Sequence, residues 1–98
     1  MIRLFISQPM RGKADEEILA ERAEAIQRAT EETGEEVEVI DSFFRGADLT
    51  HPLEYLGENL KLLAKADVAY FAPGWHKARG CLIEHECAEQ YGIRHIVT

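Results

Sequence analysis

The apolar run Val68–Ala72 constrains the fold of this chain more than any other segment. Its length suits a strand that is buried on both faces, and the Pro73-Gly74 pair predicts a turn directly after it. A short polar loop and a predicted helix that carries Glu84 follow this turn. In an open parallel α/β sheet, ligands bind above the carboxyl ends of the strands. Glu84 is therefore a candidate functional carboxylate, with an ordinary solvated helix glutamate as the alternative.

The rest of the chain repeats the alternation of strand and helix. The other predicted strands, each mostly apolar or alternating, are Met1–Ile6, Glu35–Ile40 and Ile93–Val97. Helical spacing of apolar residues predicts helices over residues 14–33, over residues 52–64, and from Gly80 or Cys81 to Tyr91. The order βαβαβαβ predicts one α/β domain over residues 1–98. We expect a small open parallel sheet of about four strands, flavodoxin-like or Rossmann-like, with helices on both faces.

Local signals define the ends and the buried faces of these helices. Asp15 is the predicted N-cap of the first helix, Gly34 is its C-cap, and Gly92 closes the third helix. The apolar residues that recur at helical spacing in the first helix are Ile18, Leu19, Ala23, Ile26 and Ala29. In the third helix the side predicted to pack consists of Ile83, Cys87 and Tyr91, and the side that carries Glu84 also holds Cys81, His85 and Ala88.

Charge and length exclude several classes of partner. The net charge of −7 argues against a nucleic-acid polymer, because the chain offers no basic face to replace the counterions. No apolar run approaches the ~18–20 residues that span a bilayer, and the N-terminal segment lacks the features of a signal peptide. We therefore expect a cytoplasmic protein without a membrane partner, in which Cys81 and Cys87 are reduced thiols. A domain of 98 residues buries a modest core, so we expect a homo-oligomer, a dimer or larger.

The loop after the first strand is a candidate anion-binding segment. It leads into a helix N-terminus, where free amides and the helix dipole favour negative charge. The candidate binding residues in it are Ser7, Gln8, Met10, Arg11 and Gly12. The loop matches neither the P-loop pattern nor the GxGxxG fingerprint. A polar turn with solvated basic residues is an equal alternative.

Four further candidates flank the ends of the predicted strands. Asp67 opens the third strand, which places it at the amino end of the sheet or makes it a cap of the preceding helix. Asp41 and Phe43 follow the second strand, and Trp75 follows the Pro-Gly turn. Aromatic rings at these positions would stack on a base or a sugar, with burial in the core as the alternative.

The cysteine and histidine residues make only a weak metal motif. A zinc site would use Cys81 and His85 at helical spacing together with His76 from the loop, but paired CxxC spacing is absent. A Cys–His nucleophile pair lacks a third group that would orient it. Two isolated cysteines are more often small buried hydrophobic residues. We therefore expect neither a metal nor a cofactor.

Three segments together resemble the nucleoside 2-deoxyribosyltransferase superfamily and its relatives, the 2′-deoxynucleoside 5′-monophosphate N-glycosidases. FISQPMRGKADEEILAERAEAI is similar to the first strand and phosphate loop of the glycosidases. KADVAYFAPG resembles the Ala-Asp-Val strand of the family, and GCLIEHECA, which begins at Gly80, resembles the helix that carries its nucleophile. The resemblance covers most of the chain and is closest to a small bacterial and phage branch of the superfamily.

The resemblance implies cleavage or exchange of the N-glycosidic bond of a (deoxy)nucleoside or nucleotide. Glu84 would be the nucleophile and Asp67 would hold or protonate the leaving base, with Gly80 near the substrate. Arg11 with Ser7 and Gly12 would hold the phosphate or the sugar. Two positions depart from the family pattern, since Ala78 replaces a frequent aspartate and Glu86 replaces a glycine. A close Glu86 would raise the pKa of Glu84. The alternatives are a nucleotide-binding module without catalysis and a metal-binding or structural subunit of an oligomer.

Overall fold

The predicted alternation of strands and helices is confirmed by the structure, a computed structural model that describes residues 1–40 and 51–98. The elements in chain order are β1 (Ile2–Ser7), α1 (Asp15–Thr33), β2 (Val37–Val39), α2 (Pro52–Leu63), β3 (Val68–Phe71), the short 3-10 helix η1 (Trp75–Lys77), α3 (Arg79–Gln90) and β4 (Arg94–Val97). In the segments described, no helix has the length and apolar character needed to cross a membrane.

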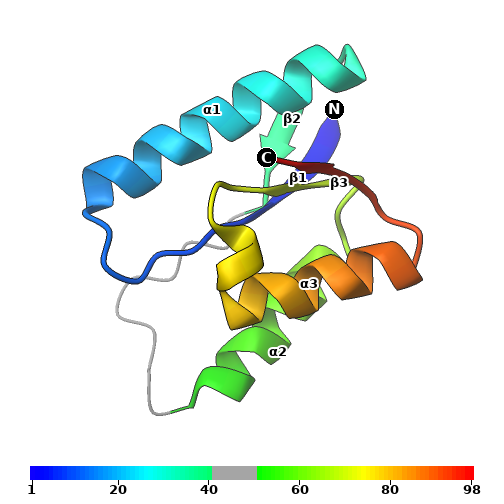
Figure 1. Ribbon diagram of the computed structural model, residues 1–98. Helices are drawn as coiled ribbons and strands as arrows, with labels where there is room; N and C mark the ends of the chain where they lie inside the picture. Colours follow the sequence, from blue (N-terminus) through cyan, green and yellow to red (C-terminus); the bar gives the residue numbers. More distant parts are fainter. Residues whose placement is uncertain (41–50) are drawn as a thin grey trace.

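The four strands form one parallel sheet in the order β2-β1-β3-β4. Leu4 of β1 lies opposite Val39 on one side and Val68 on the other, and Ser7 lies opposite Phe71. The chain moves from β1 to one neighbour through α1 and returns to the other side of β1 for β3 (Figure 1). The strand order therefore reverses between β1 and β3, which is where open α/β sheets bind ligands.

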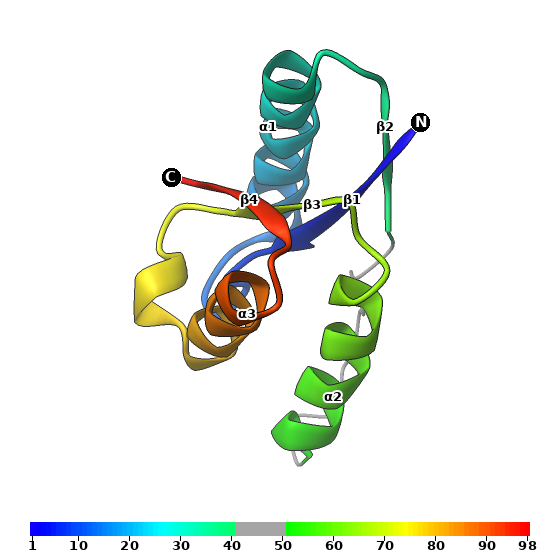
Figure 2. The same ribbon diagram turned by 90° about the vertical axis from the view of Figure 1, so that its right-hand side faces the viewer.

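Helices cover both faces of the sheet, as the sequence predicts. Figure 2 shows α1 on one side of the strands and α2 with α3 on the other. The core on the α1 side contains Leu4, Ile6, Ala25, Ala29, Val68, Tyr70, Ala72 and Ile96. The core on the other side contains Phe5, Leu63, Ala69, Phe71 and Ala88. Successive strand residues alternate between the two faces, so Ser7, two residues after Phe5, is directed to the side of α2 and α3.

The predicted buried face of α1 is partly wrong. Leu19 and Ile26 are 55% and 38% exposed, and the buried residues of this helix are Ile18, Arg22, Ala25 and Ala29. The small alanine side chains allow the helix axis to approach the sheet closely, which moves the contact stripe toward them. Asp15 is not the N-cap, because Ala14 holds that position and Asp15 lies in the first turn. Gly34 is the predicted C-cap, with φ of 70°.

The face of α3 that carries Glu84 is the one that packs, contrary to the prediction. Cys81, Glu84 and Ala88 are buried. Of the three residues predicted to pack, Cys87 contacts the edge of the core, whereas Ile83 and Tyr91 are 38% and 83% exposed. Three- and four-residue spacing places the buried set on one stripe of the helix. The helix also begins at Arg79, slightly before the predicted start. A carboxylate is therefore part of the buried side of α3.

Candidate functional site

A cavity of about 540 Å³ lies at the carboxyl end of β1, next to the point where the strand order reverses. Its walls come from the end of β1 and the loop after it, from α2, and from the first turns of α3. The described residues that line it are Phe5, Ile6, Ser7, Gln8, Pro9, Met10, Pro52, Leu53, Tyr55, Leu56, Asn59, Ala78, Arg79, Gly80, Cys81, Ile83 and Glu84. Ser7, Gln8, Met10, Gly80 and Glu84 were all predicted as site residues, and the fold brings them together.

Ser7 and Glu84 form a buried polar pair in this cavity. The Ser7 hydroxyl donates a hydrogen bond to Glu84 Oε1 over 2.5 Å. Ser7 is 1% exposed and Glu84 is 5% exposed. The alternation of side chains along β1 directs Ser7 toward α3, and the buried stripe of α3 directs Glu84 toward the sheet. The fold thus places a carboxyl group with one hydroxyl donor on the wall of an otherwise largely apolar cavity.

Burial sets the protonation of Glu84. Loss of hydration raises its pKa from 4.5 to about 7, and the hydrogen bond from Ser7 opposes part of that rise. Glu86 does not contribute to this shift, because it is exposed and accepts a hydrogen bond from Gln90 Nε2. Near neutral pH the carboxyl group is therefore present in both protonation states, which suits a group that gains or loses a proton in a reaction.

Cys81 lies in the same wall, but its thiol is poorly suited to act as a nucleophile. Burial raises the pKa of its thiol to about 11, and the nearby Glu84 adds to the rise, although a hydrogen bond with Ser7 works in the opposite direction. A cysteine reacts as the thiolate, which is scarce at neutral pH when the pKa is this high. Cys81 therefore serves as a small buried side chain, as expected.

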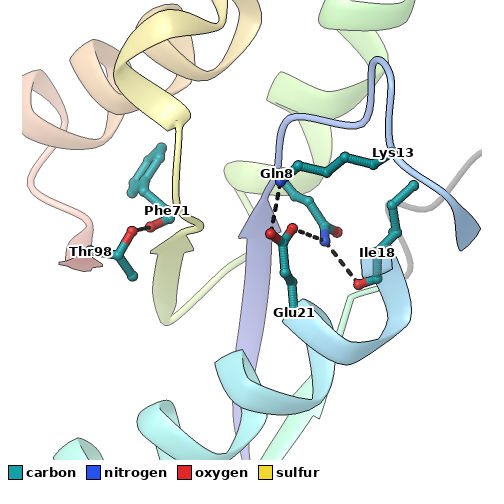
Figure 3. A network of polar contacts seen from close by, with 6 residues as sticks. All are labelled: Gln8, Lys13, Ile18, Glu21, Phe71 and Thr98. Carbon is teal, nitrogen blue, oxygen red and sulfur yellow. Dashed lines mark hydrogen bonds and ion pairs between the residues drawn. The ribbon is translucent and has the colours of Figure 1, made fainter. Parts of the chain in front are cut away.

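The loop after β1 is held against α1 by hydrogen bonds. The Gln8 amide donates to the Ile18 carbonyl and to the Glu21 carboxylate, each over 2.9 Å (Figure 3). Lys13 Nζ forms an ion pair with the other oxygen of Glu21 over 2.7 Å. Gln8 thus lines the cavity while its amide nitrogen is engaged in fixing the loop.

The same view shows Thr98 Oγ1 donating to the Phe71 carbonyl at the end of β3.

The structure does not bring Arg11 or Gly12 to the described cavity wall. Both are exposed, and Gly12 adopts a left-handed φ of 78° that suits glycine. The first turn of α1 carries Asp15, Glu16 and Glu17, which already place negative charge at the end of the helix where an anion would bind. The predicted anion site at this loop is therefore disfavoured by the charges around it.

The N-terminus of α3 is better suited to bind an anion than that of α1, because its first turn carries no negative charge. Ala78, Arg79 and Gly80 line the cavity, no side chain caps the helix, and its first turn has no acidic residue. Free backbone amides at this end attract an anion. Arg79 was not predicted as a site residue, although a signal existed, since a basic residue at a helix N-terminus opposes the dipole unless an anion is nearby.

Asn59 is a second lining residue that sequence reasoning missed. It is 7% exposed, and its buried Oδ1 accepts no hydrogen bond from the described residues. A buried amide oxygen without a donor costs stability, so its presence indicates a role other than packing. The available signal was a polar residue one helical turn before Leu63, which is buried on the core-facing stripe of α2.

Asp67 lies at the amino end of the sheet, away from Glu84. Its Oδ2 accepts a hydrogen bond from the Arg3 backbone N–H over 2.8 Å, and it precedes the first paired residue of β3. The cavity lies at the opposite ends of these strands. Within one chain the pairing of Asp67 with Glu84 is therefore wrong, because a parallel strand separates its amino and carboxyl ends by its own length.

The remaining predicted residues lie outside the cavity. Trp75 does not line it, because its ring stacks on His85 with centroids 4.4 Å apart. The weak zinc motif considered from the sequence is not formed either, since the structure groups His85 with Glu89 and His95 rather than with Cys81 and His76. The predicted binding residues Asp41 and Phe43 lie outside the described residues.

Nearly the whole chain matches one protein family. The matching family model is that of a domain of unknown function, DUF4406, and it covers residues 2–98. The chain belongs to the DUF4406 family. No curated protein and no solved structure matches it. The DUF4406 match spans every described wall of the cavity, from Phe5 to Glu84.

In this DUF4406 domain, replacing Glu84 by glutamine is expected to remove a pH-dependent loss of stability. The folded state binds the Glu84 proton more tightly than the unfolded state, so the contribution of Glu84 to stability is greatest below pH 4.5 and falls as the pH rises to about 7. Glu84→Gln keeps an acceptor for Ser7 without the charge. Urea denaturation above pH 7 should show the variant more stable by about 3 kcal/mol, and the two proteins similar below pH 4.5.

Glu86→Gln is the matched control, because Glu86 lies on the same helix but is exposed. It should retain the wild-type dependence of stability on pH. The assignment of Glu84 is contradicted if Glu84→Gln unfolds with the same pH dependence as the wild type.

Asp67→Ala is expected to weaken the fold of the DUF4406 domain without affecting the cavity. The Arg3 amide loses its carboxylate acceptor, which should lower the free energy of unfolding by about 1 kcal/mol. The fall of stability between pH 4.5 and about 7 should remain, since it comes from Glu84 at the other end of the sheet. Disappearance of that pH dependence in the variant would show that Asp67 acts on the Glu84 site.

Proposed function

We propose that this domain cleaves or exchanges the N-glycosidic bond of a (deoxy)nucleoside or nucleotide, with Glu84 as the nucleophile. The observation that carries the proposal is the buried Ser7–Glu84 pair on the wall of the cavity at the carboxyl end of β1. The resemblance of the Gly80–Ala88 segment to the nucleophile helix of the deoxyribosyltransferases supports the same residue. The cavity volume of about 540 Å³ lies in the range of small-molecule sites.

The proposed reaction proceeds through a glycosyl-enzyme intermediate. A Glu84 carboxylate oxygen attacks the anomeric carbon, the bond from that carbon to the base nitrogen breaks, and the base leaves with the bonding electrons and takes up a proton. Water then attacks the anomeric carbon of the ester, which releases the sugar and restores the carboxylate. A second base in place of water gives exchange. Ser7 holds the Glu84 side chain in position and stabilises its charged form.

An anionic group of the substrate would bind at the start of α3. The first turn of this helix has no side-chain cap, and Arg79 lines a cavity in which Glu84 is the only acidic lining residue described. The N-terminus of α1, by contrast, already carries three carboxylates. A 5′-phosphate is the anionic group of a nucleotide that these donors would hold. This assigns to Arg79 the role that the sequence suggested for Arg11.

A second candidate function is nucleotide binding without turnover. The observation that favours it is the presence of a single carboxylate among the described lining residues. Glycosidases usually pair a nucleophile with a second acidic group that protonates the leaving group. Asp67, which the resemblance assigns to that role, lies at the other end of the sheet.

The test is incubation with a panel of deoxynucleosides and their 5′-monophosphates, followed by chromatography for free base. Wild type and Glu86→Gln should release base, whereas Glu84→Gln should not. Because the nucleophile must be ionised, kcat/KM should rise with pH to a plateau above about 7 and fall roughly tenfold per unit below it. Arg79→Ala should weaken binding of monophosphates more than of nucleosides.

The outcomes separate the two candidate functions. Saturable nucleotide binding with intact ligand recovered would replace the catalytic proposal by the binding module. Both candidate functions are ruled out if the wild type and Glu84→Gln alike bind no member of the panel and release no base. A rate that falls as the pH rises through 7 would assign Glu84 the role of an acid rather than a nucleophile.

We also propose that the protein is a homo-oligomer of the cytoplasm, the compartment in which cysteines stay reduced and free nucleotides occur. Leu53 is 77% exposed and Ile83 is 38% exposed, and both lie at the cavity. Exposed apolar residues of this kind are stabilised by a second subunit. Light scattering during size-exclusion chromatography should give the mass of a dimer or a larger assembly, and Leu53→Glu should shift it toward the monomer. A monomeric wild type would contradict this prediction.

A further inference from the structure

Three side chains outside the Glu84 cavity converge between α3 and the edge strand β4. His85 and Glu89 lie one helical turn apart on α3, and His95 lies on β4. Each offers one ligand atom, and these atoms all lie within 4.8 Å of one another. None of the three residues lines the Glu84 cavity. The cluster is therefore a separate feature of the fold, and it differs from the zinc set suggested by the sequence.

Both imidazole rings have a polar partner nearby. His95 Nδ1 lies 2.9 Å from the Ile93 carbonyl oxygen, which can only accept, so Nδ1 carries the hydrogen and Nε2 is left with its lone pair. His85 Nε2 lies 3.6 Å from Glu89 Oε1. A backbone carbonyl that fixes the tautomer of a histidine is a common companion of a metal ligand.

Aromatic packing limits the movement of the His85 ring. Trp75 stacks on it at a centroid distance of 4.4 Å and an interplanar angle of 25°, and Phe71 meets it edge-on at 5.1 Å. The His85 and His95 rings are 5.0 Å apart in an edge-to-face arrangement. Two of the three donors are thus held before any ligand binds, and only the exposed Glu89 side chain is free to adjust.

We propose that His85, Glu89 and His95 bind a divalent transition-metal ion of the zinc class. Two imidazole nitrogens and one carboxylate oxygen form a donor set that Zn²⁺ accepts, with water in the fourth position. Donor atoms around tetrahedral zinc lie roughly 3.3 Å apart, so the three donor atoms, which lie within 4.8 Å of one another, need to draw closer when the ion binds. The ion would link the second half of α3 to β4, whose other edge has no neighbouring strand in the described sheet. This proposal does not depend on the reaction assigned to Glu84.

The experiment is a titration of the full chain, first treated with a chelator, with Zn²⁺ alone. Isothermal calorimetry should give a single saturable site at neutral pH. Trp75 is the sole tryptophan and stacks on His85, so its fluorescence should change over the same range of zinc concentration. Zinc should also raise the melting temperature, because it binds the folded state. Mg²⁺ at the same concentration should produce none of these effects, since it prefers oxygen ligands and retains its water.

Variants assign the site to these residues. Glu89→Gln and His95→Gln should each weaken zinc binding by about tenfold or more. His76→Gln is the matched control, because His76 is exposed, lies beside Trp75 and is not part of the cluster. Glu89 is exposed, so its replacement tests the proposal even if His95→Gln disturbs packing. The proposal is overturned if zinc does not bind, if Glu89→Gln binds it as tightly as the wild type, or if His76→Gln loses binding equally.

Discussion

The parallel pairing of β1 with β3 is the constraint on which the cavity and the core both depend. It places the carboxyl end of each strand at the same edge, with Ser7 opposite Phe71. The polar turn after β1 and the turn that leads into α3 therefore leave the sheet side by side. Because strand residues alternate, the same pairing commits Phe5 to the core beneath α2 and α3 and directs Ser7 to the carboxylate of α3.

The sequence was sufficient to predict the architecture and only part of the site. Short apolar runs and helical spacing identified the four strands and the three α-helices of the described residues, because burial on both faces of a parallel sheet leaves a strong pattern. The short helix η1 was predicted as a loop. The spacing of apolar residues does not indicate which stripe of an amphipathic helix packs against the sheet. Ile83 and Cys81 are both apolar neighbours of Glu84, and only packing decides that Cys81 is buried while Ile83 is exposed.

The errors at the site have a related cause. Ser7 and Glu84 were found from their local place in the chain. Ser7 comes at the end of the first strand, and Glu84 lies on the helix that follows the third strand. Asp67 was assigned to the site through resemblance, although its place before a strand put it at the other edge of the sheet. Arg79 and Asn59 were missed because their importance arises from a cavity built by segments distant in sequence.

The N-termini of α1 and α3 differ in the charges of their first turns. Both α1 and α3 begin at the edge of the sheet where the strands end, on opposite faces, and each has free amides in its first turn. Acidic residues in its first turn neutralise the end of α1, and Lys13 is engaged with Glu21. The end of α3 keeps its amides and Arg79, yet the buried Glu84 one turn later resists ionisation. An anion bound at α3 would raise the pKa of Glu84 further, whereas the positive charge that develops on the sugar in the proposed reaction would lower it. In the proposed reaction the nucleophile must therefore ionise against both its burial and the bound anion, and the positive charge that develops on the sugar offsets that cost.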